Sequence, residues 1–143
     1  MKRKFKEYYM SIAYQSASLS HAVKLQVGAV IVTKTGVILT SWNGTPIGWD
    51  NCCEVEMATI QEGGSYLKTK PEVIHAESNC ISKLAKSTES GKDAFMFITH
   101  APCMECAKLI YQTGITNVFY TETYRSTAGL EFLQKCGITV EHL

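Results

Sequence analysis

The apolar residues near the start of the chain recur at intervals of three and four. Between residues 5 and 17 they are Phe5, Tyr8, Tyr9, Ile12, Ala13 and Ala17. This spacing is typical of an amphipathic helix that buries one stripe of side chains. We therefore expect an N-terminal helix whose apolar side packs against the core.

Two stretches rich in β-branched residues follow, at residues 27–34 and 37–42. Thr35 and Gly36 lie between them, and glycine readily adopts the positive φ that a tight hairpin turn requires. We expect the two stretches to pair as antiparallel strands. Beyond them, residues 43–71 lose any regular pattern around several Gly and Pro residues. A long loop is expected there, and such loops in small proteins usually carry function.

The rest of the chain alternates between helical and strand-like segments. Helices are expected at residues 74–85, 103–112 and 128–136, and strands at residues 94–99, 118–120 and 138–141. Gly114 and Gly137 stop two of the helices. The order α-β-β-α-β-α-β-α-β predicts right-handed crossovers and a mostly parallel sheet covered on both faces. In such a sheet the working site lies at the carboxyl ends of the strands.

Length and composition limit the function classes. The chain of 143 residues corresponds to one domain, residues 1–143. Lys and Arg number 14 and Asp and Glu 13, a net charge of +1 that argues against a protein that wraps a nucleic acid. Hydrophobic residues make up 45% of the chain, which is enough for a buried core. Because no segment has the apolar length of a membrane span or a secretory signal, we expect a cytoplasmic protein with no membrane partner.

The cysteines give the first indication of chemistry. In a reducing compartment, the 6 cysteines are interpreted as metal ligands, catalytic thiols or small core residues rather than as disulfides. Cys80 and Cys136 fall on the apolar stripes of expected helices, and we interpret them as packed core thiols.

The most informative residues open two of the expected helices. They form the motifs His75-Ala-Glu77 and Pro102-Cys103-Met-Glu-Cys106. Residues three apart share one helix face, so both thiolates can bind a single ion, and the helix N-terminus favours their ionised forms. One imidazole and two thiolates are a zinc ligand set that leaves the fourth position to water, as in catalytic zinc sites. Glu77 would lie beside the ion without binding it, placed to move protons.

Each motif alone allows other interpretations. An isolated His-x-Glu has little specificity, and Cys103 with Cys106 could form a redox dithiol of the thioredoxin type. A non-catalytic zinc-stabilised module is a third possibility, and His100 as a fourth ligand would give such a structural site. Together, however, H-x-E and P-C-x-x-C are the signature of zinc-dependent nucleobase deaminases.

The segments around these motifs resemble the deoxycytidylate (dCMP) deaminase family, and bacteriophage members in particular. Besides the two motifs, the resemblance includes residues 27–32, 42–46, 51–53, 112–115 and 122–124. It implies a cytidine-deaminase-like fold with three α/β/α layers and a five-stranded mixed sheet. It also implies hydrolysis of dCMP to dUMP and ammonia, which feeds thymidylate synthesis.

The same resemblance implies roles for individual residues. His75, Cys103 and Cys106 would hold one zinc ion per chain. Glu77 would pass a proton to N3 of the cytosine ring and then to the departing amine. The implied substrate contacts are Asn43, Thr45, Ala76, Ala101, Lys24, Tyr124 and Arg125. Of these, Asn43 would bind the sugar hydroxyl, the Ala101 carbonyl would accept from the exocyclic amino group, and Lys24 or Arg125 would bind the phosphate.

The chain departs from the family pattern in two places. Lys24 stands in a segment where family members usually have arginine, so a point charge replaces a forked donor. Residue 22 is Ala and residues 54–70 contain no His, so Cys52 and Cys53 lack partners for the second zinc site of some phage members. Asn43 also has a second interpretation, as the turn-former of an Asn-Gly pair.

Regulation and substrate range follow from the same resemblance. Family members are commonly homohexamers that dCTP activates and dTTP inhibits, which implies a homo-oligomer with effector nucleotides and Mg²⁺ near Gly44, Pro46 and Gly48. Relatives with the same metal chemistry act on free cytidine, guanine or tRNA adenosine, so these substrates are alternatives. The near-neutral charge disfavours tRNA, whereas Asn43 and Asn79 favour the nucleotide.

Overall fold

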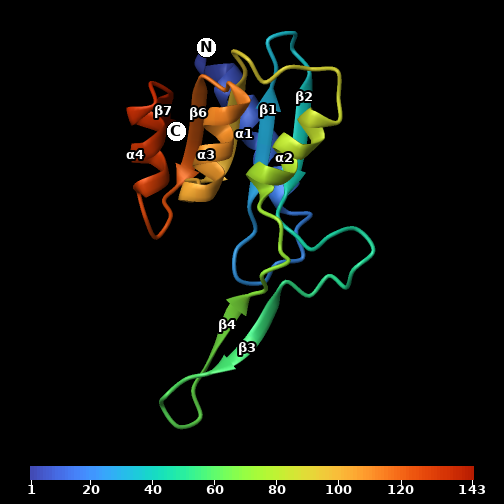
Figure 1. The fold of residues 1–143 in the computed structure, drawn as a ribbon, viewed down its shortest axis with the longest axis vertical. Helices are drawn as coiled ribbons and strands as arrows, with labels where there is room; N and C mark the ends of the chain where they lie inside the picture. Colours follow the sequence, from blue (N-terminus) through green and yellow to red (C-terminus); the bar gives the residue numbers. More distant parts are fainter.

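The computed structural model describes residues 1–143, and its centre is a five-stranded mixed sheet (Figure 1). The strands are β1 (Gly28–Val32), β2 (Ile38–Trp42), β5 (Phe95–His100), β6 (Asn117–Glu122) and β7 (Thr139–His142), in the order β2-β1-β5-β6-β7. The expected hairpin is confirmed, because β1 and β2 pair antiparallel from Gly28↔Trp42 to Val32↔Ile38. The expectation of a mostly parallel sheet is wrong: β1 also pairs antiparallel with β5, and only β5 with β6 and β6 with β7 are parallel.

Four helices cover the two faces of the sheet. Helix α1 (Arg3–Ala17) packs on one face, mainly against β1, β2 and β5. Helices α2 (Ala76–Ala85), α3 (Met104–Thr113) and α4 (Ala128–Lys135) pack on the other face (Figure 1). The arrangement is the three-layer α/β/α architecture that the sequence resemblance implied.

Strand β1 is an interior strand of the sheet, and its position explains why its sequence is a continuous apolar run. All five of its residues are buried. Ala29 and Ile31 belong to the core cluster beneath α2, α3 and α4, whereas Val30 and Val32 belong to the cluster beneath α1. A strand that is covered on both faces has no polar side to present, so its hydrophobicity does not alternate.

Helix α1 forms where it was expected, but its buried side is rotated from the predicted stripe. Its buried residues are Met10, Ala13, Ser16 and Ala17. Phe5 is 44% exposed and Tyr8 54% exposed, so these two aromatic residues lie outside the core. The helix approaches the sheet so closely that a Cβ on Gly28 would lie 1.8 Å from the carbonyl oxygen of Ala13. Small residues at this contact therefore decide which side of α1 faces inward.

The two cysteines expected in the core differ. Cys80 is completely buried in α2, and this burial raises the pKa of its thiol to about 11. Cys136 is half-buried at the end of α4 and belongs to neither core cluster, so that expectation is wrong. The helix ends at Lys135, so Cys136 is its C-cap residue rather than part of its apolar stripe.

A second, two-stranded sheet lies within the segment that was expected to be a loop. Strands β3 (Glu54–Ala58) and β4 (Ser65–Thr69) pair antiparallel and project from the body as a hairpin (Figure 1). Every residue of the two strands except Glu54 is exposed. The alternation of a half-buried strand is therefore missing from this sequence, which is why the pattern gave no indication of strands.

The chain connections that matter for function gather at one end of the sheet. Strands β5 and β6 are parallel and end together there, and β2 also ends at this edge because it pairs antiparallel with β1. The hairpin leaves the body at the same end (Figure 1). None of the helices combines the length and the apolar composition that crossing a membrane would require.

Candidate active site

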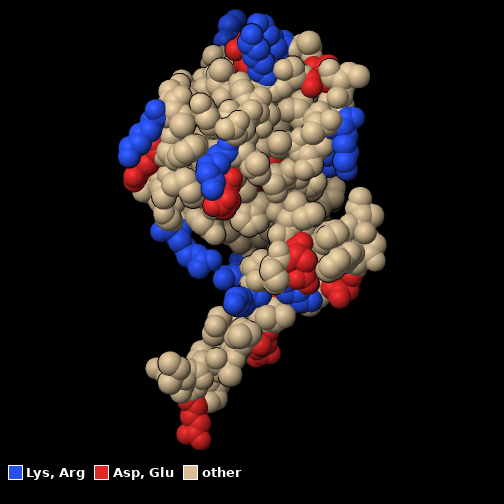
Figure 2. Space-filling view, in the orientation of Figure 1, with Lys and Arg blue, Asp and Glu red and all other residues tan.

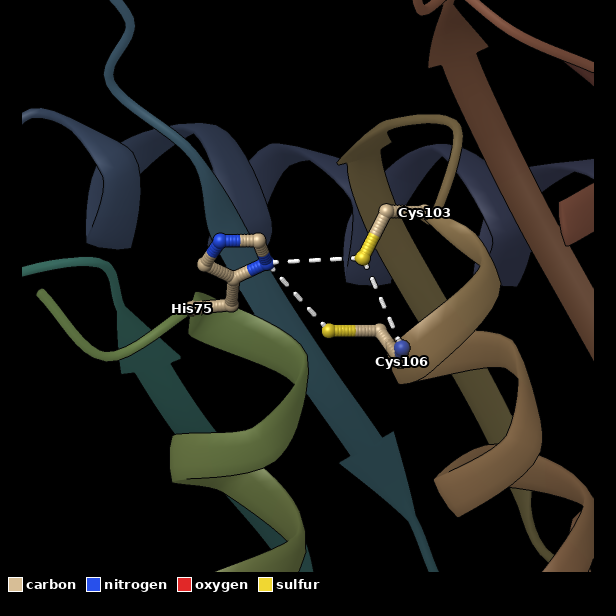
Figure 3. A group of neighbouring side chains, drawn as sticks. All are labelled: His75, Cys103 and Cys106. Atoms are coloured by element: carbon tan, nitrogen blue, oxygen red, sulfur yellow. Dashed lines mark hydrogen bonds between the residues drawn. The ribbon is translucent and has the colours of Figure 1, made fainter. Parts of the chain in front are cut away.

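The three predicted zinc ligands converge where two helices begin. His75 directly precedes α2, Cys103 directly precedes α3, and Cys106 lies in the first turn of α3 (Figure 3). The Nδ1 atom of His75 is 3.6 Å from the sulfur of Cys103 and 3.4 Å from that of Cys106, and all three ligand atoms lie within 4.8 Å of one another. Tetrahedral zinc with Zn–S bonds of about 2.3 Å and Zn–N bonds of about 2.0 Å separates nitrogen and sulfur by roughly 3.5 Å. The three side chains therefore fit a zinc ion.

The start of α3 is built around Cys103. Its backbone is extended, so it is the N-cap residue, and its sulfur accepts a hydrogen bond from the backbone N–H of Cys106 at 3.5 Å. A helix N-terminus carries partial positive charge and unpaired N–H groups, both of which favour a thiolate. One geometry thus caps the helix and orients both sulfurs toward His75.

Hydrogen bonds within the triad make Cys103 the thiol that loses its proton more readily than Cys106. The pKa of Cys103 lies well below its ordinary value, first because the Cys106 thiol donates a hydrogen bond to it and then because His75 does. The same hydrogen bond, together with burial, raises the pKa of Cys106. The pKa of His75 is raised as well, chiefly by its bond to Cys103. Metal ligands must be deprotonated, so Cys103 offers a ready thiolate at neutral pH.

Glu77 lies beside this triad without belonging to it. The residue is in the first turn of α2 and is only 4% exposed. Burial raises the pKa of its carboxyl group to about 7, and the nearby charge of His75 opposes this shift only in part. A carboxyl group with such a pKa can both take up and release a proton near neutral pH.

A cavity of about 380 Å³ opens beside these residues, and its wall includes His75, Glu77 and Cys103. The predicted substrate contacts that line it are Lys24, Asn43, Ala76, Ala101, Tyr124 and Arg125. Its volume is within the usual range for small-molecule sites. The metal ligands therefore face a space that a ligand can enter, which is the arrangement of a catalytic rather than a structural zinc site.

Other residues singled out from the sequence lie away from the cavity wall. Thr45 donates its hydroxyl hydrogen to the carbonyl oxygen of Asp50 at 2.6 Å, and Asn79 donates to the carbonyl oxygen of Trp42 at 3.1 Å. Gly44, Pro46 and Gly48 are also absent from the wall. Gly44 instead forms two backbone hydrogen bonds with Ile74, the residue before the ligand His75.

The side chain of Asn43 is hydrogen-bonded to the loop that precedes β1. Its Oδ1 accepts from the backbone N–H of Val27 at 2.9 Å, and its Nδ2 donates to the carbonyl oxygen of Leu25 at 2.8 Å. The side chain therefore fixes the loop that precedes β1. It does so while lining the cavity, so it is both a loop-former and a wall residue.

The cavity also contains residues to which sequence reasoning assigned no role there. Cys53 and Glu54 line it from the base of the hairpin, and His100 lines it from the end of β5. The Nδ1 atom of His100 contacts the Thr99 hydroxyl at 2.9 Å, and burial lowers the pKa of its imidazole. The cluster of ligand atoms does not include His100, so a four-ligand structural site is not formed.

Two cations at the cavity have no acidic partner. Neither Lys24 nor Arg125 takes part in any of the ion pairs of the structure. The guanidinium carbon of Arg125 lies 5.8 Å from the ring centre of Tyr124. Exposed basic and acidic side chains gather where the hairpin leaves the body (Figure 2).

Comparison with known proteins agrees with this geometry. A family model, the cytidine and deoxycytidylate deaminase zinc-binding region, matches residues 3–122. The chain belongs to this family. The deoxycytidylate deaminase of Saccharomyces cerevisiae is 33% identical over 141 residues, which are 98% of this chain but 45% of the yeast protein. The chain thus spans less than half the length of that relative.

Two further relatives match over most of their own length. Human deoxycytidylate deaminase is 35% identical over 140 residues, covering 93% of this chain and 76% of the human protein. The dCMP deaminase from the cyanophage S-TIM5 has a crystal structure in complex with dCMP and dUMP. Its sequence is 42% identical to this chain, and the two structures compare with a TM-score of 0.88. That comparison covers 100% of this chain and 99% of the cyanophage chain.

The backbone of Cys103 lies in close contact with α4. A Cβ at Gly129 would lie 2.2 Å from the carbonyl oxygen of Pro102 and 3.0 Å from the carbonyl carbon of Cys103. Gly129→Ala should therefore displace Cys103 and weaken zinc binding by on the order of tenfold, which competition with a chromophoric chelator measures. Gln134→Ala, at an exposed position of the same helix, is the control. Unchanged zinc affinity in Gly129→Ala would show that the metal site does not depend on this contact.

Proposed function

We propose that this protein is a zinc-dependent hydrolase that converts dCMP to dUMP and ammonia, with residues 1–143 forming one deaminase domain. The observation that carries the proposal is the position of Glu77, which is buried beside the triad of His75, Cys103 and Cys106 and lines the same cavity. The cyanophage relative was crystallised with dCMP and dUMP, which supports this substrate and product.

The side chains suit this hydrolysis. His75, Cys103 and Cys106 would hold the zinc, which when bound would supply a water acidic enough to serve as a nucleophile near neutral pH. Glu77, with a pKa raised to about 7, is placed to take a proton from that water. It would deliver that proton to N3 of the ring, and would then move a second proton, from the hydroxyl newly added to the ring carbon, to the departing amine. Protonation of the amine makes it a better leaving group.

The cavity wall also offers main-chain groups for the base. Ala76 is the first residue of α2, so its N–H has no partner within the helix and can donate to the pyrimidine carbonyl oxygen. The carbonyl oxygen of Ala101 can accept from the exocyclic amino group. Because Ala76 and Ala101 are both buried, rigid backbone would hold the ring in a fixed orientation toward Glu77.

Glu77→Gln tests the proposed proton transfer. The amide cannot exchange the proton, so kcat for dCMP should fall by about 10²–10⁴-fold, followed by the change in ultraviolet absorbance as dCMP is consumed. Zinc content should stay at one ion per chain, because Glu77 is not a ligand. The control is Glu105→Gln, an exposed glutamate of the first turn of α3. A Glu77→Gln protein with full activity, or metal analysis returning two ions per chain, would contradict the proposal.

We propose that Lys24 and Arg125 bind the phosphate and that Tyr124 supports Arg125. Both cations line the cavity and lack a carboxylate partner, so neither must break an ion pair to bind an anion. Tyr124 lies against the guanidinium and limits its positions. Asn43 lines the same wall and is the proposed contact of the sugar hydroxyl. Thr45 lies away from the wall and would affect substrate binding through the conformation of its loop.

Substrates with and without a phosphate test this assignment. Lys24→Ala and Arg125→Ala should each raise KM for dCMP by on the order of tenfold, since each removes a charged hydrogen-bond donor. Steady-state kinetics with deoxycytidine, which has no phosphate, should show little change. Lys108→Ala provides the control, because Lys108 is exposed on α3 outside the cavity. Equal effects on both substrates would refute a phosphate role.

We further propose regulation in a homo-oligomer, with dCTP as activator and dTTP as inhibitor, each bound with Mg²⁺ near Gly44, Pro46 and Gly48. The supporting contact is the pair of hydrogen bonds between Gly44 and Ile74, of 3.1 and 2.8 Å, because Ile74 directly precedes His75. In the same loop, Ile47 is fully exposed and Trp49 is 59% exposed, as expected of residues that a second subunit covers.

Kinetics and mass determination test the regulatory proposal together. The dCMP saturation curve should be sigmoidal, should become hyperbolic with dCTP and Mg²⁺, and should shift to higher dCMP with dTTP, because effectors that bind one state preferentially change its population. Light scattering should give the mass of a homo-oligomer, for which the proposed state is a hexamer. A curve that dCTP with Mg²⁺ leaves unchanged in shape, or a monomer, would contradict the proposal.

A further inference from the structure

Glu54 is an unusual residue in the projecting hairpin because it alone is buried. It is 9% exposed, whereas the remaining residues of β3 and β4 face solvent. A carboxylate is rarely buried without partners that compensate for its lost hydration. Glu54 lies at the base of the hairpin, in the cavity wall. Its burial there must therefore be compensated by hydrogen bonds.

The partners of Glu54 belong to the loop between α1 and β1. Its Oε1 accepts two backbone hydrogen bonds, from the N–H of Val23 at 3.0 Å and from that of Lys24 at 3.1 Å. Hydrogen bonds to a charged acceptor are about twice as strong as those between neutral groups. Glu54 thus holds the backbone of this loop at the residue whose side chain lines the cavity.

A second clamp holds the same loop on its other side. The Asn43 amide bonds the carbonyl oxygen of Leu25 and the N–H of Val27. Lys24 lies between the two clamps, and its own ammonium has no ion-pair partner. The loop is therefore fixed through its backbone, and the charged end of Lys24 is left free for a ligand.

We infer that Glu54 is a positioning residue that fixes the backbone of Val23 and Lys24 and so presents the Lys24 ammonium to the substrate phosphate. The inference rests on the proposed dCMP activity and extends it from the cavity to the hairpin. Glu54 is not proposed to bind the phosphate itself, because its negative charge repels a phosphate and its Oε1 already accepts from the two N–H groups. The first residue of β3 thereby becomes part of the substrate site.

Three variants separate positioning from other roles. Glu54→Ala removes the acceptor, Glu54→Gln retains a carbonyl oxygen that can accept both N–H groups, and Glu56→Ala changes an exposed glutamate of the same strand. Binding of dUMP and of deoxyuridine to the zinc-loaded protein is measured by calorimetry. Glu54→Ala should weaken dUMP by on the order of tenfold and leave deoxyuridine unchanged. Glu54→Gln should retain most of the dUMP affinity, and Glu56→Ala all of it.

A double-mutant cycle with Lys24→Ala tests whether Glu54 acts through Lys24. If it does, Glu54→Ala should have little further effect on dUMP binding once Lys24 is absent. An equal loss in both backgrounds would overturn the inference. So would an equal loss of dUMP and deoxyuridine, which would indicate general disruption of the cavity.

Hydrogen exchange tests the clamp without any nucleotide. The amides of Val23 and Lys24 should exchange on the order of tenfold faster in Glu54→Ala than in the wild type or in Glu56→Ala. Unchanged exchange at these two amides would refute the clamp even if the enzyme is active. Conversely, a wild-type protein that exchanges as expected but neither deaminates dCMP nor binds dUMP would refute the proposed function and leave the clamp itself established.

Discussion

The contact of one imidazole with two sulfurs is the constraint on which the rest of the structure depends. His75 Nδ1 meets Cys103 and Cys106 only because α2 and α3 begin at the same end of the sheet. The packing of α2 against β1 and β2, and the start of α3 directly after β5, bring the two helix starts together. Glu77 is buried at the same place, since it lies in the first turn of α2, two residues beyond His75. Its raised pKa follows from that burial.

Most elements of the sheet body could be predicted from the sequence because their periodicity reflects burial. The apolar run of β1 and the helical spacing in α2 and α3 gave their positions to within a few residues. The order and direction of strands could not be predicted in the same way. A continuous apolar run indicates burial on both faces but not the neighbours of a strand, so the antiparallel pairing of β1 with β5 was missed. The buried side of α1 depends on its close approach to Gly28, the first residue of β1. Hydrophobic periodicity along the helix carries no information about such a contact.

Site residues could be predicted from the sequence where the chemistry allows only a few residue types. They could not be predicted where the tertiary fold alone brings a common residue type into the cavity wall. His75, Cys103 and Cys106 stand out because few residue sets bind zinc, and the structure brings them together. Glu54 gave no comparable signal: it reads as one of many surface glutamates until the hairpin turns it toward the loop before β1. The one available signal was the length of the irregular segment, which pointed to function without naming a residue. His100 was noticed as a histidine, but its place in the cavity wall depends on where β5 ends.

The residues proposed to react lie at helix starts, whereas much of the remaining cavity wall lies in loops. Catalysis and ligand recognition therefore depend on different parts of the fold. The triad and Glu77 lie at helix starts where Ala76, Glu77 and Cys106 are buried, so a change at these positions disturbs the core as well as the reaction. The wall that faces the rest of a ligand comes from loops, which Asn43 and Glu54 tie together through backbone atoms. Backbone ties leave side chains such as Lys24 free to differ without loss of the loop conformation. Glu54 also joins that wall to a hairpin whose other strand residues face solvent, and Cys53 and Thr69 at the hairpin base line the same cavity, so the base of the hairpin is part of the wall.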